Sequence, residues 1–421
     1  MRQTRRTFLG TAAATAAFAW APPLLGQAKP RVVVIGGGAG GGTLARYLAK
    51  DSEGAVDVTL IEPNATYHTC FFSNLYIGGF YDYDALGHTY GKLASDFGVT
   101  VLQDAAAGVD RDAKTVTTAG GQTLAYDHLV VAPGIDFVDG AVPGWSLADA
   151  ETMPHAYKGG EQVRLLKAKI EAMPQGGVFG MVAPPNPYRC PPGPYERISM
   201  VAWLLKQSNP TAKILLVDPK ESFSKQGLFE EGWARHYPGM ITRIGPDFGG
   251  DKVEVRPAAM EIVIDGEVEK VDAANIIPAQ RAGQIAADAG LTNEAGWVPV
   301  DPFTMASKAD PAVTVLGDAS QQGDMPKSGF SANSQAKVAA NAIRGALTGS
   351  RVFPAKYSNT CWSLIAADNG VKVGATYEPT EEKIASVDSF ISQTGEDAAL
   401  RKATYQESLG WYTGITADIF G

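Results

Sequence analysis

The chain has 421 residues, of which 45% are hydrophobic, and its formal net charge is −9 at pH 7. A chain of this length can bury a large core and is expected to hold two or three domains. The acidic balance argues against nucleic acid and anionic membrane surfaces as partners, because both attract basic proteins. A basic partner protein remains compatible with it, although an acidic surface is also a common route to solubility.

The N-terminal segment has the pattern of an export signal. It begins with the stretch TRRTFL, continues as an alanine-rich apolar run to Trp20 and ends in small residues at Ala28. The apolar run is too short and too mild to be a membrane span. We therefore predict that residues 1–28 are a twin-arginine signal peptide and that the mature protein is periplasmic, without stable membrane insertion. Removing this segment, which holds three arginines and no acid, takes the net charge from −9 to −12.

The next stretch, RVVVIGGGAGGGTLARYLAK, predicts a strand, a glycine-rich turn and a helix. Three glycines fill the G-x-G-x-x-G positions, namely Gly36, Gly38 and Gly41. A second predicted strand ends at Glu62, about 20 residues beyond the glycines, where a carboxylate can accept hydrogen bonds from a ribose. Strand, glycines, helix, strand and acid in this order predict a dinucleotide-binding site.

Two later segments favour FAD over NAD at this site. The stretch LVVAPGI, which contains Pro133 and Gly134, resembles the second FAD contact of flavoproteins with two dinucleotide-binding domains. The stretch TVLGDAS, which contains Gly317 and Asp318, resembles their C-terminal box, in which the aspartate binds a ribityl hydroxyl. Ser331 is expected to cap the helix that follows, with its positive end toward the flavin. The alternative is that Asp318 is a turn residue and that this helix serves packing alone.

These elements predict an α/β fold with two Rossmann-like domains and a smaller C-terminal domain. The FAD-binding domain is expected to be discontinuous, over residues 29–150 and 283–355. A second Rossmann-like domain is expected at 151–282, with a hairpin at Asp265-Gly266. Residues 356–421, rich in turn residues and aromatics, are expected to form the C-terminal domain.

The second Rossmann-like unit has an unusual loop, PPNPYRCPPGPYE, at residues 184–196. It follows a predicted strand at 177–182 and precedes a helix that we expect to begin after Glu196. In a nucleotide-binding unit this loop would supply backbone N–H groups to a pyrophosphate, but its six prolines have none to offer. We therefore predict that the nicotinamide site of this domain is lost.

The cysteines and histidines limit the further cofactors. The chain has three cysteines (Cys70, Cys190 and Cys361), and no CxxCH motif that would attach a haem. The five histidines share no metal-ligand spacing, so no metal site is predicted. In an oxidising compartment two of the three cysteines are expected to pair, which leaves one to be explained.

Three stretches together resemble the flavoprotein subunit of flavocytochrome c sulfide dehydrogenase, a relative of the sulfide:quinone oxidoreductases. They are NATYHTCFFSNLYIGG (64–79), RCPPGPYE (189–196) and NTCWSLI (359–365). The resemblance implies that Cys70 joins the 8α carbon of FAD as a covalent cysteinyl link. It also implies that Cys190 and Cys361 form a redox-active disulfide, which sulfide attacks. The prolines would hold Cys190 rigidly beside the flavin.

The resemblance further implies a heterodimer with a separate cytochrome c subunit that receives the electrons. Glu196, six residues beyond Cys190, is then a candidate for proton transfer. The residues alone leave alternatives open: Cys70 as a small buried side chain, the other two cysteines as a structural staple, and Glu196 as an acid stabilised by a helix dipole. Alternative functions are a sulfide:quinone oxidoreductase at a membrane surface, against which the absence of a basic amphipathic tail argues, and a non-catalytic flavin-binding protein.

Overall fold

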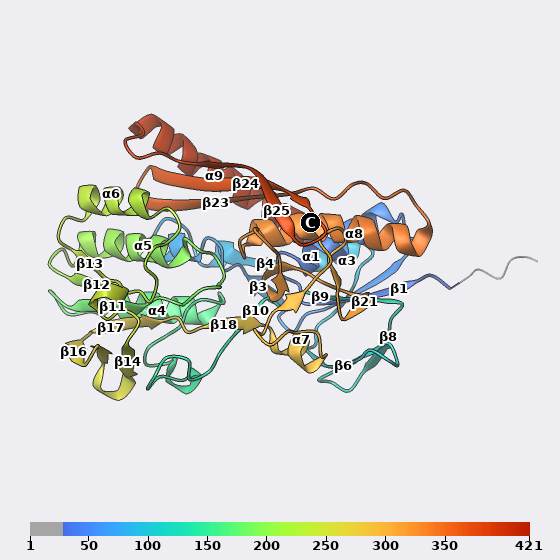
Figure 1. Ribbon diagram of the computed structural model, residues 1–421, viewed down its shortest axis with the longest axis horizontal. Helices are drawn as coiled ribbons and strands as arrows, with labels where there is room; N and C mark the ends of the chain where they lie inside the picture. The colour runs from blue at the N-terminus through green and yellow to red at the C-terminus, as the bar shows by residue number, and fades with distance from the viewer. Residues whose placement is uncertain (1–27) are drawn as a thin grey trace, which may run out of the picture.

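The computed structural model describes residues 28–421, so the predicted signal peptide lies outside the described residues, apart from its last residue. The chain forms two α/β lobes side by side, with the C-terminal region lying across them (Figure 1). None of the helices among residues 28–421 is both long and apolar enough to cross a membrane.

The first lobe, at the right of Figure 1, is built on a six-stranded sheet with the order β20-β21-β9-β1-β2-β5. Its strands are β1 (Arg31–Ile35), β2 (Asp57–Ile61), β5 (Thr100–Leu102), β9 (His128–Val131), β20 (Ala306–Ser307) and β21 (Asp310–Val315). All neighbours are parallel except β20 and β21. The valines of β1 are almost fully buried because both faces of a parallel sheet are covered.

Two long helices position the ligand-binding end of this sheet. Helix α1 (Gly41–Asp51) follows β1, and helix α8 (Gly329–Thr348) packs against α1. Ser328 caps α8, because its hydroxyl accepts a hydrogen bond from the N–H of Ser331. The prediction that Ser331 itself is the cap was wrong, because the helix begins two residues before it.

The second lobe, at the left of Figure 1, contains a parallel four-stranded sheet with the order β13-β12-β11-β17. Its strands are β11 (Val178–Val182), β12 (Lys213–Val217), β13 (Ile241–Ile244) and β17 (Ala273–Ile276). The helices of this lobe are α4 (Glu161–Glu171), α5 (Gly193–Ser208) and α6 (Gln226–His236). Helix α5 begins at Gly193, before Glu196, so Glu196 lies in its first turn. The helix therefore starts earlier than expected.

An antiparallel sheet of β14 (Val253–Arg256), β15 (Glu261–Ile264) and β16 (Glu267–Lys270) completes this lobe. Asp265 and Gly266 join β15 to β16, both with positive φ, so the predicted hairpin is confirmed. The lobes are linked where β10 (Ile135–Phe137) pairs with β18 (Gln280–Ala282).

The C-terminal region is an antiparallel sheet of β23 (Tyr357–Ala366), β24 (Asn369–Pro379) and β25 (Ile384–Ile391), followed by α9 (Ala398–Phe420). Strand β23 contacts α5 of one lobe and α8 of the other. Residues 356–421 are thus mostly regular structure, although their composition suggested turns. With this region, the two parallel α/β units confirm the predicted fold class.

Shorter elements fill the connections of the described chain. The helices among them are α2 (Ser73–Ile77), α3 (Gly91–Phe97) and α7 (Gln284–Asp288). The strands are β3 (Thr66–His68), β4 (Gly87–Thr89), β6 (Ala106–Asp110), β7 (Thr115–Thr118), β8 (Thr123–Ala125), β19 (Val298–Pro299) and β22 (Ser320–Gln321). Single turns of 3-10 helix occur at Asp84–Leu86, Leu147–Asp149, Pro246–Phe248, Pro257–Ala259 and Gly317–Ala319.

Candidate functional site

The glycine turn between β1 and α1 leaves no room for side chains. Gly36 has a φ of +95°, and a Cβ added there would lie 2.4 Å from the carbonyl oxygen of Ala132. A Cβ on Gly41 would lie 1.9 Å from the carbonyl oxygen of Gly36. Glycine is therefore required here by close backbone approach, as in turns whose N–H groups hold a phosphate.

Glu62, directly after β2, holds this turn in place. Its side chain is 6% exposed, and one carboxylate oxygen accepts a bond of 2.9 Å from the N–H of Gly37. The other oxygen accepts bonds from the backbone and side-chain nitrogens of Asn64, at 3.0 and 2.7 Å. Glu62, the acid predicted to contact a ribose, therefore also fixes the glycine turn, because its carboxylate accepts the hydrogen bond from Gly37.

A large pocket starts at this turn and runs toward the second lobe. Its volume is about 1410 Å³ including its open mouth. All but one of the residues predicted for the site line it: Gly36, Gly38, Glu62, Cys70, Pro133, Gly134, Cys190, Glu196, Gly317, Asp318 and Cys361. Gly41 is the exception and lies beneath the turn. The structure therefore brings together residues that lie up to 325 positions apart in the sequence.

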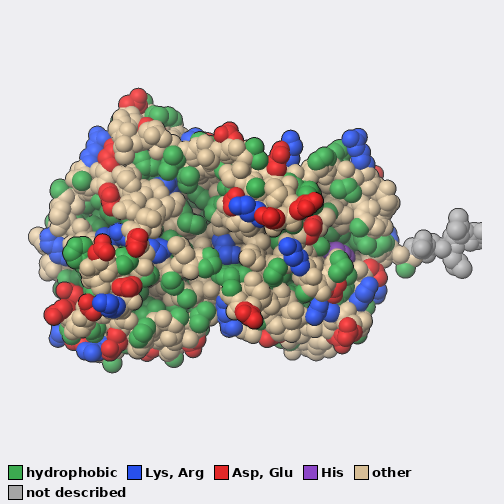
Figure 2. Space-filling view, viewed as in Figure 1, with side chains coloured by type: hydrophobic (Ala, Val, Ile, Leu, Met, Phe, Trp, Pro, Cys, Tyr) green, Lys and Arg blue, Asp and Glu red, His purple; other side chains and the backbone are tan. Residues whose placement is uncertain are grey.

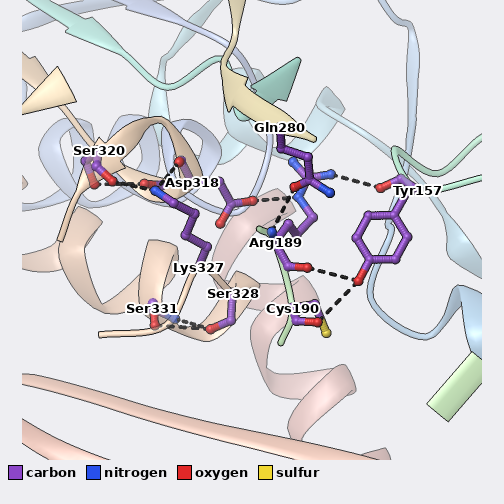
Figure 3. Close-up of polar contacts among 10 residues, drawn as sticks. Tyr157, Arg189, Cys190, Gln280, Asp318, Ser320, Lys327, Ser328 and Ser331 are labelled. Atoms are coloured by element: carbon purple, nitrogen blue, oxygen red, sulfur yellow. Dashed lines mark hydrogen bonds and ion pairs between the residues drawn. The ribbon is translucent and has the colours of Figure 1, made fainter. Parts of the chain in front are cut away.

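Asp318 carries a buried oxygen without a partner. Its Oδ2 accepts a bond of 2.6 Å from Nε of Arg189, which lies on the proline-rich loop of the other lobe (Figure 3). Its Oδ1 is buried and unpaired within the described chain. Such a group is normally satisfied in a native protein, so it fits a ligand hydroxyl in the pocket. No local sequence pattern marks Arg189 as a site residue.

Cys190 is held by its backbone in the left-handed region, with a φ of +56°. Its N–H donates to the carbonyl of Lys327 at 2.6 Å, and its own carbonyl accepts from the N–H of Gly193 at 2.7 Å. The hydroxyl of Tyr157 adds a bond of 3.2 Å to the same carbonyl (Figure 3). Positive φ is rare outside glycine and is maintained only where the surroundings fix it. Burial raises the pKa of the Cys190 thiol.

Cys361, on β23, has polar groups around its sulfur and its carbonyl. The Nδ2 atom of Asn359 lies 3.4 Å from Sγ, in position to donate to it. Nζ of the buried Lys225 donates to the carbonyl of Cys361 at 3.0 Å and to the hydroxyl of Ser363 at 2.8 Å. Burial raises the pKa of Cys361, whereas Asn359 and Lys225 oppose that rise. Within residues 28–421 all three cysteines are free thiols.

Lys225 is a buried cation that the sequence analysis missed. It is 5% exposed, and burial lowers its pKa to about 8, an effect that the nearby Cys361 and Glu196 oppose. It stands 136 residues before Cys361 in the sequence, and no local motif marks it. A buried lysine with a strongly shifted pKa beside two thiols is a candidate functional residue.

Glu196 connects three parts of the protein. One oxygen accepts from Nδ2 of Asn74 at 2.8 Å, and the other accepts from the N–H of Leu364 on β23 at 2.8 Å. Asn74 is oriented in turn by the Nε of Arg197, at 3.0 Å. Burial raises the pKa of Glu196, so its protonated form is favoured relative to an exposed glutamate. Burial also lowers the pKa of Arg197 to about 10.

Cys70 lies in the loop between β3 and α2, on the wall of the same pocket. Its carbonyl accepts from the hydroxyl of Ser73 at 2.5 Å and from the N–H of the same residue at 3.2 Å. Phe72, with a φ of +70°, turns the chain into α2. The loop is thus folded back on itself, which keeps Cys70 at the pocket.

In the second lobe, the acid at the position equivalent to Glu62 already binds neighbouring side chains. Asp218 follows β12, as Glu62 follows β2, and it is fully buried. It accepts bonds from the hydroxyl of Tyr195 at 2.9 Å and from Nε of Arg243 at 3.0 Å, and Nζ of Lys220 lies 2.7 Å away. Its hydrogen-bonding capacity is therefore used within the protein.

No cluster of three or more potential metal ligands occurs among residues 28–421. On the face drawn in Figure 2, acidic and basic side chains alternate over both lobes, without a large region of one sign.

Family models match three parts of the chain. Residues 163–278 match the central domain of the sulfide dehydrogenase [flavocytochrome c] flavoprotein chain, and residues 354–420 match the flavin-binding domain of flavocytochrome c sulphide dehydrogenase. Residues 30–169 match the pyridine nucleotide-disulphide oxidoreductase model. The flavoprotein chain of this dehydrogenase from Chlorobaculum thiosulfatiphilum is 52% identical over 44 residues, which are 10% of the present chain and 90% of that relative. The chain belongs to this flavoprotein family.

More distant members of the same fold are sulfide:quinone oxidoreductases. The mitochondrial enzyme of Mus musculus is 22% identical over 295 residues, which cover 68% of this chain and 65% of the relative. The enzyme of Aquifex aeolicus is 34% identical over 111 residues, 26% of this chain and 25% of that protein. The chain thus aligns with less than two thirds of the length of these relatives.

The solved structure of the Aquifex aeolicus sulfide:quinone oxidoreductase superimposes with a TM-score of 0.67 at 19% identity, covering 93% of this chain and 92% of that one. This similarity concerns the fold. Membership of this family supports a flavin cofactor. The pocket at the glycine turn is its candidate site and is called the flavin pocket below.

Proposed function

We propose that this protein is a periplasmic sulfide dehydrogenase flavoprotein subunit, which oxidises sulfide to sulfur or polysulfide and passes the electrons to a separate cytochrome c subunit. The observation that carries the proposal is the convergence of Cys190, Cys361 and Glu196 on one pocket with the glycine turn and Asp318. The chain has no CxxCH motif, so the haem would belong to the partner.

FAD fits the residues of this pocket. The N–H groups of the glycine turn would hold the pyrophosphate, and the unpaired Oδ1 of Asp318 would accept from a ribityl hydroxyl. Cys70 would form the covalent cysteinyl link. Bound FAD would accept two electrons and release them singly to a haem.

The thiols of Cys190 and Cys361 would form the disulfide that sulfide attacks. HS⁻ forms a bond to one sulfur while the disulfide bond breaks and the other sulfur leaves as a thiolate. The Asn359 amide would stabilise negative charge on the sulfur of Cys361, and Lys225 would provide a nearby cation. Glu196, protonated more readily than usual, would exchange a proton with the sulfur species.

The central test is anaerobic mixing of the oxidised protein with sulfide while the flavin absorbance is followed. We expect rapid bleaching in the wild type and none with NADH. Equal bleaching by NADH would contradict the loss of the nicotinamide site, and no bleaching by sulfide would overturn the proposed function.

The acceptor is tested separately with cytochrome c and with a soluble quinone. A sulfide:quinone oxidoreductase, the function of the relatives from mouse and Aquifex, would reduce the quinone and leave the cytochrome oxidised. The covalent link is tested by acid precipitation: the wild type should keep its flavin in the pellet, and Cys70→Ala should release it.

A further inference from the structure

We propose that a second pocket, on the face of the C-terminal sheet, is the port through which a small anionic sulfur nucleophile reaches Cys361. The inference rests on the proposed function and specifies the route and the cysteine that it serves. The pocket has a volume of about 620 Å³ including its open mouth. Cys361 lines both this pocket and the flavin pocket, whereas Cys190 lines the flavin pocket alone.

The register of the sheet places the lining residues on one face. Cys361 on β23 lies opposite Val373 on β24, and Asn359 lies opposite Ala375. Because side chains of a strand alternate between two faces, residues two apart share the face toward the pocket. The same wall includes Gly374, Tyr377, Ser386 and Ser389, of which Ser386 pairs with Tyr377 and Ser389 with Ala375.

The opposite wall comes from the proline-rich loop and its surroundings. Pro191 and Pro192, which directly follow Cys190, line it together with Pro326 and Ser224. The pocket therefore lies against Cys361 and against the two prolines that follow Cys190. With FAD in the first pocket, the second pocket would offer a separate approach to Cys361.

The lining fits a small, soft anion better than a large or strongly hydrated one. The walls combine apolar side chains with hydroxyls, and the one carboxylate, Asp324, is already paired with Lys383 at 2.6 Å. The buried Lys225 lies behind Cys361 and favours a negative charge at its sulfur. Hydrosulfide and short sulfane-sulfur anions meet these conditions.

On the side of the second pocket, the side-chain amide of Asn359 is held in a fixed orientation next to the sulfur of Cys361. Ser328, the cap of α8, donates to Oδ1 of Asn359 at 2.6 Å, so the Nδ2 of that amide faces Sγ. Asn359 is 3% exposed and lines the second pocket. Asn359 is a positioning residue, because its Nδ2 donor points at Sγ of Cys361, the atom to which the incoming sulfur would bind.

The reaction at this port exchanges one S–S bond for another. HS⁻ attacks Sγ of Cys361, a new S–S bond forms there, the bond to Cys190 breaks, and Cys190 leaves as a thiolate in the flavin pocket. The disulfide is reduced and the sulfide sulfur is oxidised to a persulfide on Cys361. This assigns the two cysteines different tasks.

The test measures access to the thiol and needs no turnover. The flavin-loaded protein is reduced anaerobically with a phosphine and treated with iodoacetamide, and peptide mass spectrometry follows alkylation at Cys190 and Cys361. Ser386→Trp should narrow the mouth and slow alkylation of Cys361 at least roughly tenfold, because thiol reactivity depends on access. Val387→Trp is the matched control, since Val387 is 62% exposed on the same strand and does not line the pocket. It should change the rate by less than about twofold, as surface substitutions do.

Equal alkylation of Cys361 in the wild type and in Ser386→Trp would overturn the proposal. If that variant does not fold, Ser389→Trp narrows the same mouth from the next position of the wall and is judged by the same criterion. A second measurement locates the persulfide after oxidised protein receives one equivalent of sulfide: it should be on Cys361, and a persulfide on Cys190 would overturn the assignment. Failure of sulfide to bleach the flavin would contradict the proposed function but would leave the alkylation result unchanged.

Discussion

The ion pair between Arg189 and Asp318 joins the two lobes at the flavin pocket, and breaking it should destabilise the protein strongly. The two side chains are 13% and 10% exposed, and the charged atoms are 2.6 Å apart. At that distance Coulomb's law with an effective dielectric constant of about 20 gives an attraction of about 6 kcal/mol, part of which offsets the cost of removing both groups from water. Asp318→Asn leaves the guanidinium buried without its carboxylate, so we expect a loss of about 3 to 5 kcal/mol.

The assay is urea unfolding of the flavin-loaded protein, followed by flavin fluorescence, which reports separation of the lobes. A double-mutant cycle with Arg189→Met isolates the pair, because the double variant buries neither charge. We expect the double variant to be more stable than the sum of the single effects by about 2 kcal/mol. Additivity within about 0.5 kcal/mol would refute the reasoning, since it would mean that the two groups do not interact.

A matched control is available in the same chain. Asp324 and Lys383 are also 2.6 Å apart, but their side chains are 38% and 49% exposed. Exposed pairs contribute about 1 kcal/mol at most, so Asp324→Asn should have a small effect. Equal losses at the two sites would show that burial is not the cause of the difference.

Three further predictions concern the pocket. Burial raises the pKa of Glu196, so its contribution to stability is present below pH 4.5 and is lost as the pH rises through the folded-state pKa. The free energy of unfolding of Glu196→Gln, measured at several pH values, should therefore fall less with rising pH than that of the wild type. A difference between the two proteins that stays constant with pH would contradict this prediction. Gly41→Ala should abolish flavin retention because its Cβ would collide with a backbone oxygen, whereas Gly91→Ala, with open space around it, should retain flavin. Cys361→Ser should stop sulfide from bleaching the flavin while flavin content stays at the wild-type level; bleaching at the wild-type rate would exclude a catalytic disulfide.

The sequence was informative wherever the chemistry depends on a local pattern. The glycine turn, the acid Glu62 and the Gly-Asp box with Asp318 are recognisable because each lies at a fixed distance from a strand. The parallel sheets follow from the same alternation of strands and helices. The roles of these residues stay predictions, although the structure places them at one pocket.

Other parts of the site depend on contacts between distant segments, which a local pattern does not reveal. Arg189 meets Asp318 across 129 residues, and Lys225 meets Cys361 across 136. Neither basic residue has a spacing that marks it. The cap of α8 was misplaced for a different reason: Ser328 and Ser331 are both good caps, and the choice depends on where the helix leaves the preceding loop.

The contacts of the proline-rich loop support the prediction that the second Rossmann-like unit has lost its nucleotide site. Three of the loop's N–H groups are already used: that of Arg189 donates to the side chain of Gln280, that of Cys190 to the carbonyl of Lys327, and that of Gly193 to the carbonyl of Cys190. A pyrophosphate would find no free donors among them, and Asp218 is saturated by neighbouring side chains. The same bonds fix Cys190 between the lobes at the flavin pocket. Donors that would hold a nucleotide in another flavoprotein therefore fix the backbone of Cys190 here, as the proposed entry of electrons from sulfide requires.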